Sequence, residues 1–582
     1  MRQWLHVGCL VTTLAIGGQR AVAPDNPASP SLNTDSVVQV SKPPDYIGDE
    51  RALVALGKAL FWDMQLSSDS SVACASCHFH AGADHRLFNQ GSSIKAPLPS
   101  PRLLKSADFP FARAAMNSGY RVASAGIHAR RFVAIGREGL PDTGAPLSAE
   151  GSAPSQKRTR QVASRNAPSV INAVQYYRLF WDGRASNTFN GRTSYGEDDP
   201  TAFILVEDRG QLTASSVRIE DAGLASQAVD PPINSKEMSY EGRSWPTIGK
   251  RMLSARPLAK QRVASDDSVL GPFVGDAKRG LSPALTYLEL IQAAFKPEYW
   301  RSKELVSAGG RVEGGAASAD SEFTQAEFNF SLFFGLAVQA YESTLVADAS
   351  PYDRYASGDA KALTFVQQIG LGLFRQHRCA SCHVEPELTL ATPVAVRGSK
   401  DYAALGPDAG FFFTGVEPTD NDSGLGARDP FGNFLSTTAR NRPQAATWMR
   451  GMFKTPNLRN VELTGPYFHT GSKSTLEQVI EFYTTAGDYP TPSLLVWGPH
   501  PMDRIAMPAL LKALTDERVR FERAPFDHPE LCVPGEDRWA SIPQVGARGN
   551  RVPLQTFEEL LRGVGRDGSR AHNLVTSCSI LQ

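Results

Sequence analysis

Two copies of one five-residue motif, CASCH, carry the clearest chemistry in this chain. They occupy Cys74–His78 and Cys379–His383, and in each copy the two cysteines are three residues apart with a histidine directly after them. Thiols at this spacing can bond to both vinyl groups of one haem, and the adjacent histidine can bind the iron from one face. The motifs therefore predict two covalently attached haem c groups. The attachment residues would be Cys74, Cys77, Cys379 and Cys382, with His78 and His383 as iron ligands.

A structural zinc site is the alternative for the two Cys-x-x-Cys pairs, because four thiolates can bind one zinc ion. Zinc would leave the histidine after each pair without a role. Such a site also suits a cytosolic protein better than an exported one. We therefore favour haem over zinc.

The first residues of the chain predict export. Residues 1–23 resemble a secretory signal peptide, with an early arginine, an apolar run over Leu5–Ile16 and the small residues Ala21–Ala23 before a cleavage site. Pro24 is unfavourable directly after such a site, so a cut elsewhere and a frayed N-terminal helix stay open as alternatives. Residues 24–45 are rich in Pro, Ser, Asn and Asp and predict a flexible leader. We expect a periplasmic protein.

Composition gives no reason to expect nucleic acid or an anionic membrane as a partner. The 582 residues include 60 Lys and Arg against 60 Asp and Glu, so the formal net charge is zero. No run after the N-terminal segment approaches the length of a membrane-spanning helix. Of the cysteines outside the motifs, Cys9 lies in the signal segment. Cys532 and Cys578 could form a disulfide in an oxidising compartment if they lie close enough.

A predicted helix precedes each CASCH motif. Apolar residues recur at helical spacing from Asp49 to Phe61, before the first CASCH. Thr324–Glu327 fits a capping box ahead of an apolar helix from Phe328 to about Val346. Another helix passes through Leu371 and Phe374 into the second CASCH.

Few segments alternate as strands do, so we expect a mainly α fold of two c-type cytochrome domains with long loops and insertions. The N-terminal domain would cover residues 46–355 and the C-terminal domain residues 356–582. Residues 91–165 look like a surface insertion. The segment after Asp488 looks like an extension that packs on the second domain, and we assign it no chemistry.

Four longer segments resemble the bacterial dihaem cytochrome c peroxidases and the related MauG enzymes. The resemblance spans about residues 50–485, apart from insertions at 91–165 and 186–222. The segments are LGKALFWDMQLSSDSSVACASCH, RNAPSVINAVQYYRLFWDGRA, LASQAVDPPINSKEM and FKTPNLRNVELTGPYFHTGSKSTLEQVIEFY.

The resemblance implies a peroxide pocket. Gln227, Pro231 and Glu237 match the family's Q-x3-P-x5-E pattern. Cleavage of the O–O bond needs a proton moved between the two oxygens, and a positioned carboxylate can move it. We expect Glu237 to be this acid and base and Gln227 to donate a hydrogen bond to peroxide. The alternative is that both are solvated loop residues.

Two further roles also come from the resemblance. Trp181 matches the family tryptophan between the haems, where it relays electrons; a lone tryptophan would otherwise be core packing. Asn166, Thr464 and Pro466 match a calcium site between the domains, and amide and carbonyl oxygens suit that hard cation.

Tyr483 separates the two branches of the family. The ordinary peroxidases have methionine at the corresponding position, whereas the MauG branch has tyrosine. Ser474 and Glu477 fit a capping box, and the apolar spacing after it turns Tyr483 inward on a helix. We expect Tyr483 to bind the second iron and lower its reduction potential relative to a thioether ligand. The alternative is a buried core tyrosine, with Met502 or Met507 at the iron.

The first haem is expected to be five-coordinate and open. The peroxidases often carry a distal histidine sixteen residues after the motif, where this chain has Ile94. His80 and His85 follow the motif too closely to be distal ligands, and we expect them at the surface or just outside the coordination sphere.

These expectations lead to three candidate functions. The first is a periplasmic peroxidase that reduces hydrogen peroxide at the N-terminal haem, with electrons passed through the C-terminal haem from a small cytochrome c or cupredoxin. The second is a MauG-like enzyme that uses peroxide to oxidise a tryptophan or tyrosine of a partner protein. The third is a dihaem electron-transfer cytochrome without catalysis.

Overall fold

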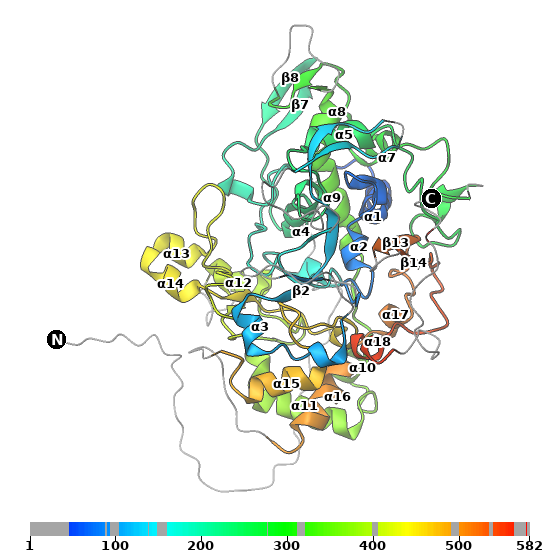
Figure 1. Ribbon diagram of the computed structural model, residues 1–582. Coiled ribbons are helices and arrows are strands. Elements are labelled where there is room, and N and C mark those ends of the chain that lie inside the picture. The colour runs from blue at the N-terminus through cyan, green and yellow to red at the C-terminus, as the bar shows by residue number, and fades with distance from the viewer. Residues whose placement is uncertain are drawn as a thin grey trace, which may run out of the picture.

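The computed structural model describes residues 46–87, 90–92, 104–137, 139–147, 160–275, 278–310, 321–398, 406–489, 500–534, 539–563 and 578. The predicted signal peptide, the leader and Ile94 lie outside these residues. Helices are the main regular elements (Figure 1). They are α1 Glu50–Trp62, α2 Ala75–His78, α3 Arg113–Asn117, α4 Gly223–Ala228, α5 Trp245–Met252, α6 Gly271–Val274, α7 Tyr287–Ala294, α8 Gln325–Phe328, α9 Phe330–Glu342, α10 Pro351–Ala356, α11 Phe365–Gln376, α12 Pro393–Gly398, α13 Thr437–Asn441, α14 Ala446–Met449, α15 Leu476–Thr484, α16 Asp503–Lys512, α17 Glu517–Arg520 and α18 Phe557–Leu561.

The strands form small antiparallel pairs and no larger sheet among the described residues. The pairs are β1 Gln90–Ser92 with β2 Arg121–Ala123, β3 Ala125–His128 with β6 Arg160–Val162, β4 Arg130–Ala134 with β5 Thr143–Pro146, β7 Ile204–Asp208 with β8 Gln211–Ser215, β9 Val306–Ser307 with β10 Glu322–Phe323, β11 Phe411–Phe412 with β12 Phe453–Lys454, and β13 Leu531–Pro534 with β14 Trp539–Ile542. The fold is therefore mainly helical with long loops, as expected. The described parts of the two predicted insertions contain several of these hairpins.

The largest apolar cluster, here called the first core, is built on α1 and α9. Asp49 caps α1 by accepting a hydrogen bond from the backbone N–H of Ala52, and Thr324 forms the predicted capping box with Glu327. Both helix starts are confirmed, although the second helix is divided at Asn329 into α8 and α9. The two long helices approach closely because Gly57 has no side chain: a Cβ at this position would overlap the carbonyl oxygen of Ala337.

A second core forms around α11, α15 and α16, which lie together at the bottom of Figure 1. The predicted helix through Leu371 and Phe374 is α11, and both residues are buried. The cap of α15 differs from the prediction by one residue. Thr475, not Ser474, accepts the hydrogen bond at the N-terminus, from the backbone N–H of Gln478. No described helix is long and apolar enough to cross a membrane.

The described residues of the C-terminal extension, taken here as residues 517 onward, pack on the first core as well as on the second domain. The prediction that the extension packs on the second domain therefore holds only in part: Phe557 shares a buried cluster with Phe482 of α15, and Arg520 pairs with Glu462. Helix α16 remains with the second core, but the buried residues Val519, Phe526 and Leu531 belong to the first core. Cys532 and Cys578 form a disulfide with their Cα atoms 6.1 Å apart, which resolves the question left by the sequence.

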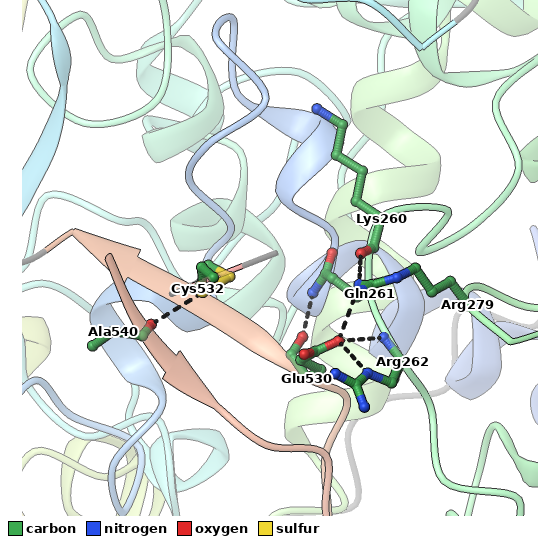
Figure 2. The surroundings of a disulfide bond; sticks show 8 residues. Lys260, Gln261, Arg262, Arg279, Glu530, Cys532 and Ala540 are labelled. Carbon is green, nitrogen blue, oxygen red and sulfur yellow. Dashed lines mark hydrogen bonds and ion pairs between the residues drawn. A yellow bond between two sulfur atoms is a disulfide. The ribbon is translucent and has the colours of Figure 1, made fainter. Parts of the chain in front are cut away.

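Polar contacts attach this extension to the first core. The Gln261 amide donates to the carbonyl oxygens of Trp62 and Glu530, both at 2.7 Å. Figure 2 shows Arg262 and Arg279 beside the Glu530 carboxylate, each with a nitrogen 3.3 Å from its Oε2 atom. These groups lie far apart in sequence and carry no apolar period, which explains why the packing could not be predicted.

A buried lysine adds a stronger link between the same two regions. The Lys58 ammonium on α1 lies 2.8 Å from Asp267 and 3.2 Å from Asp527, and all three side chains are fully buried. Removal of one member of such a group leaves uncompensated charge in the interior, so the three residues hold each other in place. The extension is thus part of the structure that surrounds the first CASCH motif.

The close approach of α1 and α9 can be tested at Gly57. Gly57→Ala should destabilise the haem-loaded protein by about 1–3 kcal/mol, because the added methyl group pushes against the α9 backbone. Gly372 on α11 is the matched control, since a Cβ there meets no atom within 4 Å. Gly372→Ala should stabilise the protein by about 0.5–1 kcal/mol. Denaturant unfolding measures both; equal effects of the two variants would contradict the close helix contact.

Candidate functional site

The first CASCH motif places its histidine for metal binding. Cys74 is the N-cap of a single helical turn, α2, which contains Cys77 and ends at His78. The Nδ1 atom of His78 donates to the carbonyl oxygen of Gly82 at 2.9 Å. Burial lowers the pKa of His78, and the Gly82 carbonyl, Asp84 and the Pro168 carbonyl oppose that shift. The imidazole is therefore neutral with Nδ1 protonated, which leaves the Nε2 lone pair for iron.

A cavity of about 320 Å³ adjoins this motif, and most of the predicted site residues line it. They come from segments far apart in the sequence. The predicted residues in the cavity wall are Cys74, Cys77, His78, Asn166, Trp181, Gln227, Pro231 and Glu237. Both thiols, the imidazole and the predicted peroxide pocket thus face one space, and this wall fits a haem attached through the first motif.

The Glu237 carboxyl has the acidity that proton transfer at neutral pH requires. Burial raises its pKa to about 7; Asp230 adds to this shift, and Arg184 and Lys236 oppose it. Its backbone is held by β3, where the N–H of Ile127 donates to the Glu237 carbonyl at 3.1 Å. A carboxyl with a pKa near the working pH can both accept and return a proton.

Trp181 is half-buried in the same wall and has a fixed orientation. Its indole Nε1 donates to the Asn166 carbonyl at 2.8 Å, and its own carbonyl accepts from the backbone N–H of Lys454 at 2.8 Å. Its ring lies 6.0 Å from that of His469, between centroids. The His469 Nε2 donates to Glu417 at 3.0 Å. Trp181 therefore joins the first cavity to segments that precede α15.

The three predicted calcium residues come together only in part. The Asn166 side-chain amide donates to the carbonyl oxygens of Pro466 at 2.6 Å and Phe468 at 3.3 Å. The Thr464 hydroxyl instead donates to the carbonyl of Val461 at 3.4 Å. A cation here would need the Asn166 side chain to present its oxygen in place of its nitrogen, a rotation of the amide that leaves the Pro466 and Phe468 carbonyls in place.

The second CASCH motif repeats the histidine geometry of the first. The Nδ1 atom of His383 donates to the Leu388 carbonyl at 3.1 Å. Burial lowers the pKa of His383 to about 4, against the opposing effect of the Leu388 and Pro456 carbonyls. The ring of Phe374 lies 6.5 Å away. This imidazole is also neutral, with Nε2 left for iron.

Tyr483 lies on α15, in the same part of the chain as the second motif. Burial raises the pKa of its phenol, and the nearby Cys382 and Cys379 thiols add to the shift. Its ring contacts Phe482 at 5.1 Å between centroids. Met507 is instead packed among the apolar residues of the second core, and Met502 lies at its edge. Tyr483 is half-buried and packs against Phe468 and Phe482, so its binding to the second iron stays a prediction.

The four motif cysteines are not gathered at one point. All four are free thiols, and among the residues that the structure describes no group of three or more Cys, His, Asp or Glu side chains could hold a metal ion. A single zinc ion bound by all four thiolates does not fit this arrangement.

His80 and His85 are buried, so of the two predicted positions the surface is wrong, and a place just outside the coordination sphere stays a prediction. Their rings stack 3.4 Å apart, and the His80 Nε2 donates to the Gln555 carbonyl at 2.8 Å in the C-terminal extension. Neither residue lines the cavity. Their burial depends on an extension that the sequence does not place.

Sequence analysis missed the charged residues of the cavity wall other than Glu237: Arg165, Asp182, Arg184, Glu342 and Lys454. Glu342 ends the apolar helix α9, and burial raises its pKa to about 8. Lys454 reaches the cavity from β12. For Glu342 the one available signal in the sequence was a lone acidic residue on an otherwise apolar helix. For Lys454 there was none, because the residues around it show no pattern that predicts burial.

Comparison with known proteins places the chain in a family. Residues 51–361 match the di-haem cytochrome c peroxidase family, CCP_MauG. Cytochrome c peroxidase Ccp of Escherichia coli (strain K12) is 23% identical over 438 residues, which are 75% of this chain and 54% of that protein. Methylamine utilization protein MauG of Methylorubrum extorquens is 31% identical over 153 residues, 26% of this chain and 34% of that protein.

The chain thus spans about half, or less, of the length of these curated relatives. Among solved structures, the diheme peroxidase BthA from Burkholderia thailandensis E264 is 19% identical with a TM-score of 0.40, over 83% of this chain and 90% of that one. The family match covers more than half of the sequence and includes the first motif and the cavity-lining segments up to α10. The chain therefore belongs to the di-haem cytochrome c peroxidase family, which implies two haem c groups as its cofactors.

Proposed function

We propose that this protein is a dihaem peroxidase that reduces hydrogen peroxide in the first cavity. One haem would be attached at Cys74 and Cys77 with His78 as its iron ligand, and the other at Cys379 and Cys382 with His383. The observation that carries the proposal is that Gln227 and Glu237 line the same cavity as the first motif. An electron-transfer cytochrome without catalysis has no need of a buried acid there.

When bound, the haem supplies the iron that binds peroxide and the electrons that reduce it. Glu237 then accepts a proton from one peroxide oxygen and returns it to the other, which leaves as water. Gln227 donates a hydrogen bond that orients peroxide. The cavity wall partly desolvates Glu237, and this raises its pKa to about 7.

Trp181 is proposed to pass electrons between the two haem sites. It lies in the cavity wall and is hydrogen-bonded through its carbonyl to Lys454, a residue of the segment that leads to the second site. The electron source would be a small cytochrome c or cupredoxin. The two domains would meet at Trp181. Residues 46–355 would surround the first haem, and residues 356–582 would contain the second. The C-terminal extension also packs on the first core.

A MauG-like oxidation of a protein side chain is the second candidate, and the position of Tyr483 favours it. A phenolate ligand would lower the potential of the second haem and make it a poor acceptor from an ordinary cytochrome donor. Trp181 would then carry oxidising equivalents toward a partner's tryptophan or tyrosine. Rapid mixing of the haem-loaded protein with peroxide, with and without reduced cytochrome c, separates the candidates: donor oxidation supports the first, and a long-lived oxidised protein with unspent donor supports the second.

Export and calcium binding complete the proposal. The Cys532–Cys578 disulfide is typical of an oxidising compartment and supports a periplasmic location. Asn166 and the Pro466 carbonyl would bind calcium together with Thr464 and water.

The acid–base role predicts a pH profile. Glu237 must be ionised to accept a proton, so with a pKa of about 7 its ionised fraction rises with pH. The second-order rate of peroxide reduction should therefore rise about tenfold per unit below pH 7 and level off above it. Glu237→Gln should lower the rate by about 10²–10⁴-fold and remove the pH dependence.

Glu342→Gln is the matched control for this experiment, since Glu342 is a second buried acid of the same wall. The Glu342→Gln variant should keep the pH dependence of the rate of peroxide reduction. A profile lost in Glu342→Gln but kept in Glu237→Gln would contradict the role of Glu237 and assign the proton transfer to Glu342.

The second iron ligand predicts a redox effect. Tyr483→Met replaces an oxygen ligand by a thioether that favours ferrous iron, so the potential of the second haem should rise strongly while that of the first stays constant. Spectroelectrochemical titration measures both potentials. Tyr489→Phe, a half-buried tyrosine just after the same helix, serves as the control; an unchanged potential in Tyr483→Met would remove Tyr483 from the coordination sphere.

A further inference from the structure

Lys454 is a buried ammonium that reaches the first cavity from the second part of the chain. Its side chain lines the cavity, and the residue is 5% exposed. The backbone fixes it on two sides, because β12 pairs with β11 and the Lys454 N–H donates to the Trp181 carbonyl. Its Nζ atom lies 3.0 Å from the centroid of the Tyr176 ring.

The other cations of the cavity wall are paired with carboxylates. Arg165 binds Asp182 and Asp422, and Arg184 binds Asp182 and Asp230. Within the described part of the chain, no carboxylate lies within ion-pair distance of the Lys454 ammonium, which lies over the Tyr176 ring. Burial alone lowers the pKa of Lys454 well below its ordinary value, with no acidic group to oppose the shift.

An ammonium taken out of water without a counter-ion is costly, by several kcal/mol in real proteins. A cation–π contact with the Tyr176 ring offsets only part of this cost, because the ring carries no net charge. The missing partner is an anion inside the cavity, and the cavity is where the first haem is proposed to bind. A haem carries two propionate carboxylates.

We propose that Lys454 binds a propionate of the haem attached at Cys74 and Cys77. This inference rests on the proposed attachment of that haem. Lys454 is then a positioning residue from the second part of the chain. Its side chain holds the first haem, and its backbone N–H holds Trp181. The haem and the electron relay would keep a constant separation because both are bound to the same residue.

The charge of Lys454 also raises the reduction potential of the first haem, since it neutralises a propionate that otherwise stabilises ferric iron. Removal of the ammonium should lower that potential. Arginine keeps the charge and its hydrogen-bond donors and should restore it.

The experiment compares Lys454→Met, Lys454→Arg and Lys473→Met with the wild type, all as haem-loaded protein. Lys473 is the matched control because its side chain is also 5% exposed, but its Nζ is paired with Asp488 at 2.7 Å. Haem content is measured first, then the potential of each haem, then the propionate bending bands in the resonance Raman spectrum.

The proposal expects a lower first-haem potential and shifted propionate bands in Lys454→Met only, with both restored in Lys454→Arg. Full haem content with unchanged potential and unchanged bands in Lys454→Met would overturn it and leave the peroxidase proposal intact. Absence of haem from the wild type would instead overturn the proposed function. If Lys454→Arg folds poorly, the Raman comparison of Lys454→Met with Lys473→Met still tests whether Lys454 binds a propionate.

Discussion

Each candidate haem site depends on one hydrogen bond, from a buried imidazole to a backbone carbonyl. His78 donates to Gly82 and His383 to Leu388. The bond keeps the proton on Nδ1, directs Nε2 away from the carbonyl and fixes the plane of the ring. The histidine is therefore oriented for iron binding in the absence of the metal. Burial lowers the pKa of both imidazoles and keeps them neutral. The helices α1 and α11 deliver the chain to these two positions, and the remaining elements enclose them.

Burial also sets the chemistry of the first cavity. The same loss of water raises the pKa of Glu237 to about 7 and lowers that of Lys454. One effect makes a carboxyl able to exchange protons at neutral pH, and the other disfavours the charged form of Lys454 unless an anion lies beside it. The two arginines of the wall avoid this cost through carboxylate partners. A cavity lined by acids with raised pKa values and by a lysine without a carboxylate partner is suited to a bound group that carries carboxylates and reacts with a small, protonated substrate.

Local patterns predicted the parts of the structure that local energetics determine. The caps of α1 and α8, the helix before each CASCH motif and the inward face of α15 all follow from spacing over one or two turns. The resemblance to dihaem peroxidases predicted which residues share the first cavity, although they lie far apart in sequence. The return of the extension to the first core could not be predicted, because Lys58 meets Asp527 across more than 400 residues. The burial of His80 and His85 follows from that return, and the burial of Lys454 depends on β11 and Tyr176.

The central claim is that two haems are bonded to this chain, one at each CASCH motif. Mass spectrometry of the protein produced with a cytochrome c maturation system, intact and after proteolysis, tests it most directly. The account predicts an intact mass increased by two haems and one haem on each of the peptides that contain Cys74–His78 and Cys379–His383. Unmodified motif peptides, or metal-bound protein without covalent haem, would contradict it.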